Sequence, residues 1–350
     1  MKKSEIIVWA SDFSTNRGEG VLANSFFNEF IKFYNNKKIT IKTFEQKILF
    51  SKNNFKNFKI IEKNNFFHKY IGPLYGAIYL LFNRRKNIVY LNYLPLWNFL
   101  IFFLLPKKTI LGPITGGSAP SEVTNFSNFL RKYILPLLYK ISLLIIKVKF
   151  KRAIFSTNLL EKYVTHDIKK KYLFGYIYLN FTHIINKEKN KKKFDLIFYN
   201  RKHLTKKNFI IKKMILRFPS KLKICVIGEP ILKKNIINCG FVARKKAVQL
   251  IRNSKLAFAS SENILSLFVI DAYNSRTGIL FDKSIKNFKS RISTNNFLPI
   301  NYNNLDFAVK KIMKYILIYK FASDIGFQKF LLKKKNEINF YLNSYFSYLE

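Results

Sequence analysis

The sequence predicts an α/β fold in which two Rossmann-like domains, each built on a parallel β-sheet, face a cleft. Short apolar runs typical of buried strands alternate with longer helical patterns in both halves of the chain. The lysine-rich stretch NKEKNKKK at 186–193 contains no apolar residue and interrupts this alternation, which indicates an interdomain linker. Ligands of such folds bind at the carboxyl ends of the strands, so we expect the site in the cleft.

The first domain is expected over 1–185. Its patterns predict, in order, strand 5–11, helix 18–36, strands 38–44, 87–93 and 108–114, helix 128–152 and strand 153–158. The opening MKKSEIIVWASDFS has only a short, interrupted apolar run, so we interpret it as a buried strand and not a signal peptide. The run LPLWNFLIFFLLP at 94–106 is too short to span a bilayer, and is either buried helix or helix that also touches lipid.

The second domain is expected over 194–325. Its patterns predict, in order, strand 194–200, helix 206–217, strand 222–228, a short strand near 235–241, helix 244–254, strand 255–261, helix 267–275, strand 277–282 and a helix from 305. A closing helix over 326–350 is a candidate for packing back on the first domain. The two halves share the doubly wound pattern, and we find no further repeat.

Composition excludes global disorder, because 49% of the 350 residues are hydrophobic and 17% are aromatic. The formal net charge is +44, from 63 basic and 19 acidic residues. Such a charge favours a polyanionic partner, either nucleic acid or an anionic membrane face. An excess of Lys, Asn, Ile, Phe and Tyr is equally typical of codon drift in an AT-rich genome. The charge therefore does not identify a partner by itself.

The cysteines and histidines do not form a metal-binding pattern. Cys225 and Cys239 lie in apolar stretches, which favours a role as small buried hydrophobic residues over a disulfide. This also favours a cytosolic location. The four histidines are expected to be structural or exposed: His68, His166, His183 and His203. We therefore expect no metal site and no cofactor.

Glycines gather at the ends of the expected strands, although the chain has only 12 of them. Three of these fall in LGPITGGSAPSE at 111–122, directly after the most apolar run. A glycine where a strand turns into a helix lets a bound group approach the backbone, and free N–H groups at the helix start attract phosphate. Turn glycines are more often structural, so each one alone is a weak signal.

The order of several segments is more specific, and it resembles the family 4 glycosyltransferases of the GT-B fold. The segments are GEG at 18–20, GPITGG at 112–117, NRKHLTKKN at 200–208, CVIGEP at 225–230, CGFVARKKAVQLIRNSKLAFASS at 239–261 and VIDAYNSRTGILF at 269–281. The resemblance covers roughly 5–320 and is more specific in the second half. It implies donor-binding roles for Gly18, Gly20 and Gly228.

By this resemblance, Arg201 and Lys206 clamp the diphosphate of a nucleotide-sugar donor and assist catalysis by neutralising the leaving group. Arginine offers a planar fork to phosphate oxygens and lysine a compact charge, which suits this role. In a chain so rich in lysine, the alternative is that both are ordinary surface cations.

The acidic positions of the family are matched less well. Asp271 stands where the family usually has a glutamate that holds the ribose hydroxyls. The first acidic position falls on Asn263, with Glu262 beside it, and ILS at 264–266 replaces the glycines that normally follow. Either the loop is shifted by one residue and Glu262 serves as the catalytic carboxylate, or that contact is lost and Asn263 occupies the donor site. We assign Glu262, while the departure is also compatible with an inactive enzyme.

The glycine-rich loop of the first half resembles GP–GGG-like loops of enzymes that assemble surface polysaccharide or lipopolysaccharide. The resemblance implies that four residues line the acceptor side of the site: Gly116, Gly117, Ser118 and Glu122. An acidic residue commonly follows the glycines in those enzymes, whereas Ser118 stands here and Glu122 comes four positions later.

Aromatic and aliphatic residues alternate with cations over 70–86, 94–108 and 128–152. Such segments are either buried helices with a solvated basic face or surfaces that lie on an anionic bilayer. No RNP, KH, zinc-finger or helix-turn-helix signature accompanies the charge, so we do not expect nucleic-acid binding.

Together these observations predict a retaining glycosyltransferase of hexosyltransferase type that moves a sugar from a nucleotide-sugar donor. The expected acceptor is a lipid-linked or surface polysaccharide of the lipopolysaccharide, O-antigen or capsule kind. The enzyme is expected to be cytoplasmic and peripherally attached to the inner face of the plasma membrane. The alternatives are a catalytically degenerate GT-B partner protein and, with charge as its sole support, a nucleic-acid-binding protein.

Overall fold

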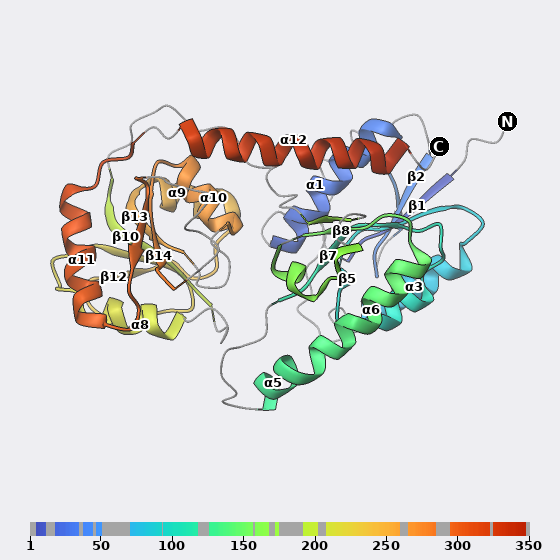
Figure 1. Ribbon diagram of the computed structural model, residues 1–350. Coiled ribbons are helices and arrows are strands. Elements are labelled where there is room, and N and C mark those ends of the chain that lie inside the picture. Colours follow the sequence, from blue (N-terminus) through green and yellow to red (C-terminus); the bar gives the residue numbers. More distant parts are fainter. Residues whose placement is uncertain are drawn as a thin grey trace. The chain divides into compact units, whose positions relative to one another are not determined.

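The protein divides into two compact units (Figure 1). Unit 1 comprises Met1–Phe181 together with Lys334–Glu350, and unit 2 comprises Thr182–Lys333. The computed structural model describes residues 5–11, 18–34, 38–44, 47–50, 71–92, 94–117, 126–156, 158–167, 172–174, 192–201, 208–259, 265–284, 295–322 and 325–347.

Unit 1 contains two sheets. The five-stranded sheet has the order β3 (Lys47–Leu49), β2 (Lys38–Lys42), β1 (Glu5–Trp9), β4 (Asn87–Tyr90), β6 (Ile110–Leu111), and only β3 is antiparallel to its neighbour. The parallel four-stranded sheet has the order β5 (Leu94–Pro95), β7 (Pro113–Thr115), β8 (Ile154–Phe155), β9 (Leu173–Phe174). The strand expected over 108–114 is therefore split at Gly112 between the two sheets.

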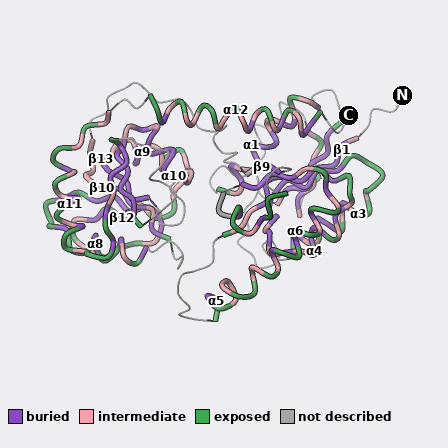
Figure 2. Tube along the Cα trace, viewed as in Figure 1, coloured by how far each residue is buried: buried purple, intermediate pink, exposed green. Residues whose placement is uncertain are grey.

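The helices of unit 1 are α1 (Gly18–Phe33), α3 (Gly72–Phe82), α4 (Phe99–Leu104), α5 (Phe126–Phe129), the π-helical turn η2 (Leu130–Ile134), α6 (Leu135–Lys149) and the 3-10 helix η3 (Asn158–Tyr163). Apart from α5, whose two phenylalanines are exposed, and η2, which has no buried residue, these helices bury apolar side chains in the core of the unit (Figure 2). Trp9, Tyr90, Phe102 and Tyr139 are large, fully buried side chains of this core. A proline in the first turn of α3 and of α6 suits a helix start, where its missing N–H costs nothing.

The last helix, α12 (Ile325–Ser347), contributes its second half to unit 1. The Tyr345 hydroxyl accepts a hydrogen bond from the Leu111 N–H at 2.8 Å and donates one to the Leu111 carbonyl at 3.1 Å. Tyr341 donates to the Ala153 carbonyl at 3.0 Å, and Tyr34 donates to that of Phe346 at 2.8 Å. These tyrosines bind backbone groups of unit 1, and the Ala153 carbonyl also accepts a hydrogen bond from the Leu173 N–H at 3.3 Å.

Unit 2 is one parallel sheet covered by helices. Its strand order is β12 (Ile236–Asn238), β11 (Ile224–Gly228), β10 (Phe194–Asn200), β13 (Ser254–Phe258), β14 (Gly278–Asp282), β15 (Phe297–Ile300). Its helices are α8 (Asn208–Arg217), α9 (Arg244–Arg252), α10 (Leu267–Asn274) and α11 (Leu305–Ile318). All residues of β11 and β14 are buried, as parallel strands covered on both faces require.

The second half confirms the expected alternation, with one addition. Strand β15 was not expected, because Pro299 interrupts its apolar run. The structure places β15 at the edge of the sheet, where a proline is tolerated since its missing N–H leaves no ladder bond open. Cys225 and Cys239 are free thiols whose sulfurs lie 3.7 Å apart. The buried role expected of both is confirmed for Cys225, whose thiol pKa is raised by burial, whereas Cys239 is partly exposed.

Lys192 and Lys193 are the residues of the expected linker that the structure describes, and both are bound to unit 2. The Lys193 N–H donates to the Asn253 carbonyl at 2.7 Å. The Lys192 ammonium donates to the Arg252 carbonyl at 2.9 Å and to Thr277 Oγ1 at 3.3 Å. Burial, and secondarily the charges of Arg252 and Arg276, lowers the pKa of Lys192 to about 8.

Among the described residues, no helix is both long and apolar enough to cross a bilayer.

Gly112 is expected to tolerate no side chain. A Cβ at this position would lie 2.0 Å from the Leu91 carbonyl oxygen, so Gly112→Ala requires a backbone shift where the chain passes between two sheets. We expect Gly112→Ala to lower the unfolding free energy of unit 1 by about 1–3 kcal/mol, measured by denaturant titration. Gly18→Ala, which meets no atom within 4 Å, is the control. Equal denaturation midpoints for Gly112→Ala and Gly18→Ala would contradict the prediction that Gly112 tolerates no side chain.

Lys192 should make the stability of unit 2 depend on pH. Its pKa is about 8 when folded and 10.5 when unfolded, so between these values the unfolded chain binds more protons. Stability contributed by this group therefore rises as pH increases from 8 to 10.5. The difference in unfolding free energy between wild type and Lys192→Met should increase over that window in denaturant titrations. Lys193→Met, at an exposed neighbour, is the control, and a flat difference for Lys192→Met would contradict the prediction.

Candidate functional site

The strand order of unit 2 creates a switch point between β10 and β13. The chain proceeds from β10 to β11 on one side of it and from β13 to β14 on the other. Both strands are parallel and paired, with Leu196 opposite Leu256, so their carboxyl ends lie at the same edge of the sheet. Ligands of open α/β sheets bind at this kind of place. Arg201 directly follows β10, and Ala259 directly follows β13.

The ends of β10 and β11 are locked together at this edge. The Asn200 side-chain amide donates to the Glu229 carbonyl at 2.9 Å, and the Glu229 N–H donates back to the Asn200 carbonyl at 3.0 Å. Gly228, between these two contacts, has φ +94°, and a Cβ there would lie 2.2 Å from the Asn200 oxygen. Only glycine fits this conformation and this close approach. These hydrogen bonds fix the backbone of Asn200, the residue directly before Arg201.

Arg201 is exposed at the end of β10. Its guanidinium carbon lies 5.5 Å from the centre of the Tyr199 ring, a distance that favours a cation–π contact. The Tyr199 ring is stacked on Phe268, at the start of α10, with centroids 6.1 Å apart. The Arg201 carbonyl accepts a hydrogen bond from the Asn208 side chain at 2.9 Å. Backbone and side chain are thus both held while the charge faces solvent, as an anion-binding residue requires.

Asp271 forms an ion pair with Arg244. The Arg244 Nη2 lies 2.8 Å from one carboxylate oxygen and its Nε 3.2 Å from the other, which is a two-pronged contact. Both side chains are mostly buried, with 19% of the Arg244 side chain and 10% of the Asp271 side chain exposed. This pair connects the first turn of α9 to the middle of α10.

Unit 1 has a switch point of its own between β1 and β4. There the buried side chain of Asn92 accepts a hydrogen bond from the Ser11 N–H at 2.7 Å. Gly18 is the exposed first residue of α1, and Gly20, two residues later in the same turn, is buried. A Cβ on Gly116 would lie 2.5 Å from the Leu160 side chain, so a packing contact already accounts for a glycine at that position.

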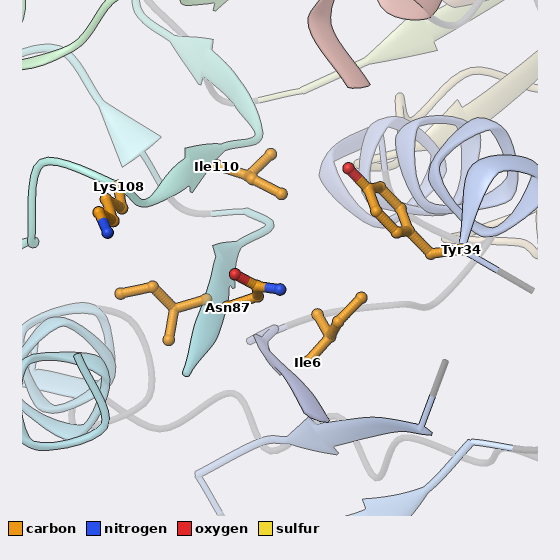
Figure 3. A pocket seen from close by; sticks show the side chains of 6 residues that line it. Ile6, Tyr34, Asn87, Lys108 and Ile110 are labelled. Atoms are coloured by element: carbon orange, nitrogen blue, oxygen red, sulfur yellow. The ribbon is translucent and has the colours of Figure 1, made fainter. Parts of the chain in front are cut away.

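A small hollow in unit 1 lies at the opposite edge of its sheet. It is lined by Ile6, Tyr34, Asn87, Ile88, Lys108 and Ile110 (Figure 3). Asn87 and Ile110 are the first residues of their strands, so this hollow lies at amino ends and not at the carboxyl ends where ligands of such sheets bind. We assign it no ligand.

The comparisons with known proteins agree with this architecture. No family model and no curated protein sequence matches the chain. Among solved structures, HepE of Anabaena in complex with UDP-glucose matches with a TM-score of 0.57 and 11% identity, covering 97% of this chain and 100% of that chain. The sucrose-phosphate synthase of Thermosynechococcus elongatus matches with a TM-score of 0.56 and 9% identity, covering 99% and 94%. The lipopolysaccharide outer core galactosyltransferase WaaB, in its apo form, matches with a TM-score of 0.53 and 10% identity, covering 98% and 99%.

These matches extend over both units, each of which is a Rossmann-like α/β unit. The chain has the GT-B fold. This confirms the fold class that the sequence predicted, and the divergence is large because identity to each of these structures is near 10%.

The GT-B fold brings two of the expected site residues to one edge. Arg201 and Gly228 lie at the carboxyl edge of the unit 2 sheet, and Asp271 lies on α10 and is bound to Arg244. The other expected residues of unit 2, Lys206, Glu262 and Asn263, lie outside the described residues, as do Ser118 and Glu122 of unit 1. Gly18, Gly20, Gly116 and Gly117 belong to unit 1, and the Gly117 carbonyl accepts a hydrogen bond from Tyr139 at 3.3 Å.

Sequence reasoning missed the residues that support the site. Asn200 ends a strand and is followed by Arg201, so a polar residue at a strand end was a usable signal for it. Arg244 stands within CGFVARKK, among three consecutive cations at the start of α9, and nothing in the sequence distinguishes it from Lys245 or Lys246. Among the described residues, no group of three metal-binding side chains occurs.

The Arg244–Asp271 pair should be energetically coupled. Removing either partner leaves a mostly buried charge without its partner, while removing both leaves none. In a double-mutant cycle of Arg244→Met and Asp271→Asn, we expect each single variant to be destabilised and the coupling energy to be about 1–3 kcal/mol, from denaturant titration of unit 2. Strict additivity of the two substitutions would contradict the pair.

Proposed function

We propose that this chain is a retaining glycosyltransferase that binds a nucleotide-sugar donor at the carboxyl edge of the unit 2 sheet. The acceptor is a lipid-linked or surface polysaccharide of the lipopolysaccharide, O-antigen or capsule kind. The enzyme works at the inner face of the plasma membrane, on the cytoplasmic side.

The placement of Arg201 is the observation that carries this proposal. Its side chain is exposed at a switch point, its carbonyl is bound by Asn208, and its guanidinium rests against Tyr199. A cation held in this way is preorganised for a diphosphate, because little freedom is lost when the anion binds. The two hydrogen bonds between Asn200 and Glu229 also fix the backbone directly before Arg201.

The similar structures support the choice of donor and acceptor. HepE was solved in complex with UDP-glucose, so a UDP-sugar is the first donor to test. WaaB is named for a lipopolysaccharide acceptor, which favours a surface glycan over a small-molecule acceptor. Since identity is near 10% in both, these similarities support the proposal through the shared fold alone.

In the proposed reaction, the bond between the anomeric carbon and the diphosphate breaks while the acceptor hydroxyl attacks the same face of the sugar. The diphosphate leaves with the bonding electrons, its departing oxygen takes up the proton of the acceptor hydroxyl, and Arg201 and Lys206 neutralise its growing charge. Glu262 is the carboxylate assigned to the transferring sugar, and Asp271 is assigned to the ribose hydroxyls. The mechanism depends on charge stabilisation and positioning and needs no protein nucleophile or metal.

A second function is favoured by the state of Asp271. Because Arg244 already contacts both of its carboxylate oxygens, Asp271 offers the ribose fewer acceptor sites than an unpaired carboxylate would. Together with the Asn263 departure, this favours a degenerate GT-B protein that binds a donor without transferring the sugar. The two functions differ in turnover and not in donor binding.

Donor binding tests the proposal. UDP-, GDP- and ADP-sugars should be titrated into the purified chain by calorimetry, and at least one should bind. Arg201→Ala should weaken that binding roughly tenfold or more, since a charge-assisted contact to phosphate is lost. Asp271→Ala should also weaken it. Arg217→Ala, which removes an exposed arginine paired with Asp306, is the matched control.

The outcomes separate the candidates. Binding accompanied by release of free nucleoside diphosphate supports the enzyme, and binding without any release supports the degenerate protein. Binding that survives both Arg201→Ala and Asp271→Ala would show that the donor site lies elsewhere. A chain that binds none of the donors contradicts both candidates.

A further inference from the structure

Helix α6 of unit 1, with the turn before it, has apolar side chains on two sides. Tyr139, Leu143 and Ile146 are buried in the core of the unit. On the solvent side, Tyr133, Leu137, Ile141, Leu144 and Val148 recur at helical spacing, from 42% exposed for Ile141 to 83% for Val148. A surface helix of a globular protein normally presents polar residues to water on that side. The exposed stripe is therefore unusual for a helix whose outer side faces water alone.

Helix α4 extends this surface. The Lys149 ammonium at the end of α6 donates hydrogen bonds to the Phe102 carbonyl at 3.2 Å and to that of Phe103. It lies 5.9 Å from the Phe103 ring, so Phe103, 65% exposed, belongs to the same surface as the end of α6. Figure 2 shows α4 and α6 as neighbours with exposed positions recurring along α6. We call the stripe on α6 together with Phe103 the α4–α6 face.

The charge around the α4–α6 face is mostly positive. Lys140 and Lys147 are exposed on α6 next to the stripe, and Lys107 and Lys108 follow α4. Between Lys63 and Leu160 the sequence contains a single acidic residue, Glu122. Lys147 has an ion pair with Asp167 at 3.8 Å, where both side chains are largely exposed and the pair is weak. An apolar ridge edged by cations is complementary to a surface with an apolar interior and anionic headgroups.

We propose that the α4–α6 face docks on an anionic lipid bilayer, with Leu144, Val148 and Phe103 entering the boundary between headgroups and acyl chains. Lys140 and Lys147 then lie at the level of the lipid phosphates. The proposal rests on the proposed function, because a transferase that glycosylates a lipid-linked acceptor must hold unit 1 at the membrane surface. It assigns that task to one face of one unit.

Charge also argues against the other occupants of this face. If a second copy of the chain packed its α6 stripe on this one, the lysines of both helices would meet with no acidic residue on either helix to pair with them. Nucleic acid would pair with the lysines, but its phosphate backbone would leave the apolar ridge facing a charged surface. A bilayer satisfies the cations and the apolar side chains together.

Vesicle sedimentation with the full chain tests the proposal. The vesicles contain phosphatidylglycerol and phosphatidylethanolamine, and pure phosphatidylcholine vesicles are the neutral comparison. We expect binding to the anionic vesicles, and Leu144→Glu combined with Val148→Glu should lower it at least tenfold, since two charges would enter the apolar boundary. The matched control is Leu317→Glu with Ile318→Glu on α11 of unit 2, where the two side chains are 82% and 60% exposed.

A second pair of variants tests the cations without changing the apolar stripe. Lys140→Gln with Lys147→Gln should weaken binding to anionic vesicles about tenfold and reduce its salt dependence. Lys310→Gln with Lys314→Gln, two exposed lysines of α11, should not. Circular dichroism and the thermal midpoint of each variant verify that it is folded.

Three results would overturn the proposal. The first is vesicle binding that the α6 variants do not change. The second is equal binding to anionic and neutral vesicles. The third is a dimer of the wild-type chain in size-exclusion chromatography with light scattering that Leu144→Glu with Val148→Glu makes monomeric. Donor calorimetry on the same variants keeps the two proposals apart, because docking without donor binding contradicts the proposed function alone, and donor binding without docking contradicts only this inference.

Discussion

The parallel pairing of β10 with β11 on one side and β13 on the other is the constraint on which the rest of unit 2 depends. Parallel strands bring all their carboxyl ends to one edge, and the reversal of strand order beside β10 leaves room there for a ligand. Arg201 therefore reaches the site because it follows β10. The same pairing requires Gly228, since the backbone of β11 passes too close to Asn200 for any side chain.

Charge has different roles in different parts of the molecule. Arg201 is exposed and held by an aromatic ring, which suits an anion that comes and goes. Arg244 is mostly buried and forms an ion pair with Asp271. This pair joins α9 to α10. Lys192 and Lys149 donate to backbone carbonyls near helix ends. The net charge of +44 therefore does not by itself indicate a polyanionic partner, because some of these cations stabilise the fold.

Much of the fold could be predicted from the sequence, because strand and helix patterns depend on residues near one another in the chain. The expected helix over 128–152 corresponds to α5, η2 and α6, and the strand over 222–228 to β11. Strand β15 was missed because a proline interrupts it, and its place at the sheet edge, which tolerates proline, is a tertiary property. The split of 108–114 into β6 and β7 was missed for a related reason, since the two parts pair with strands distant in sequence.

For the candidate site, the sequence by itself determined which residue types stand at the strand ends, Arg201 and Gly228 among them, because a strand end is marked locally by its flanking residues. Only the tertiary structure decided that Asp271 is bound by Arg244, 27 residues away, and that Asn200 locks the end of β11. Likewise, the sequence shows that α6 is apolar and basic, while burial decides which of its apolar residues face the core and which face outward. The physical reason is the same in each case, since a partner or a burial state depends on the packing of segments far apart in the chain.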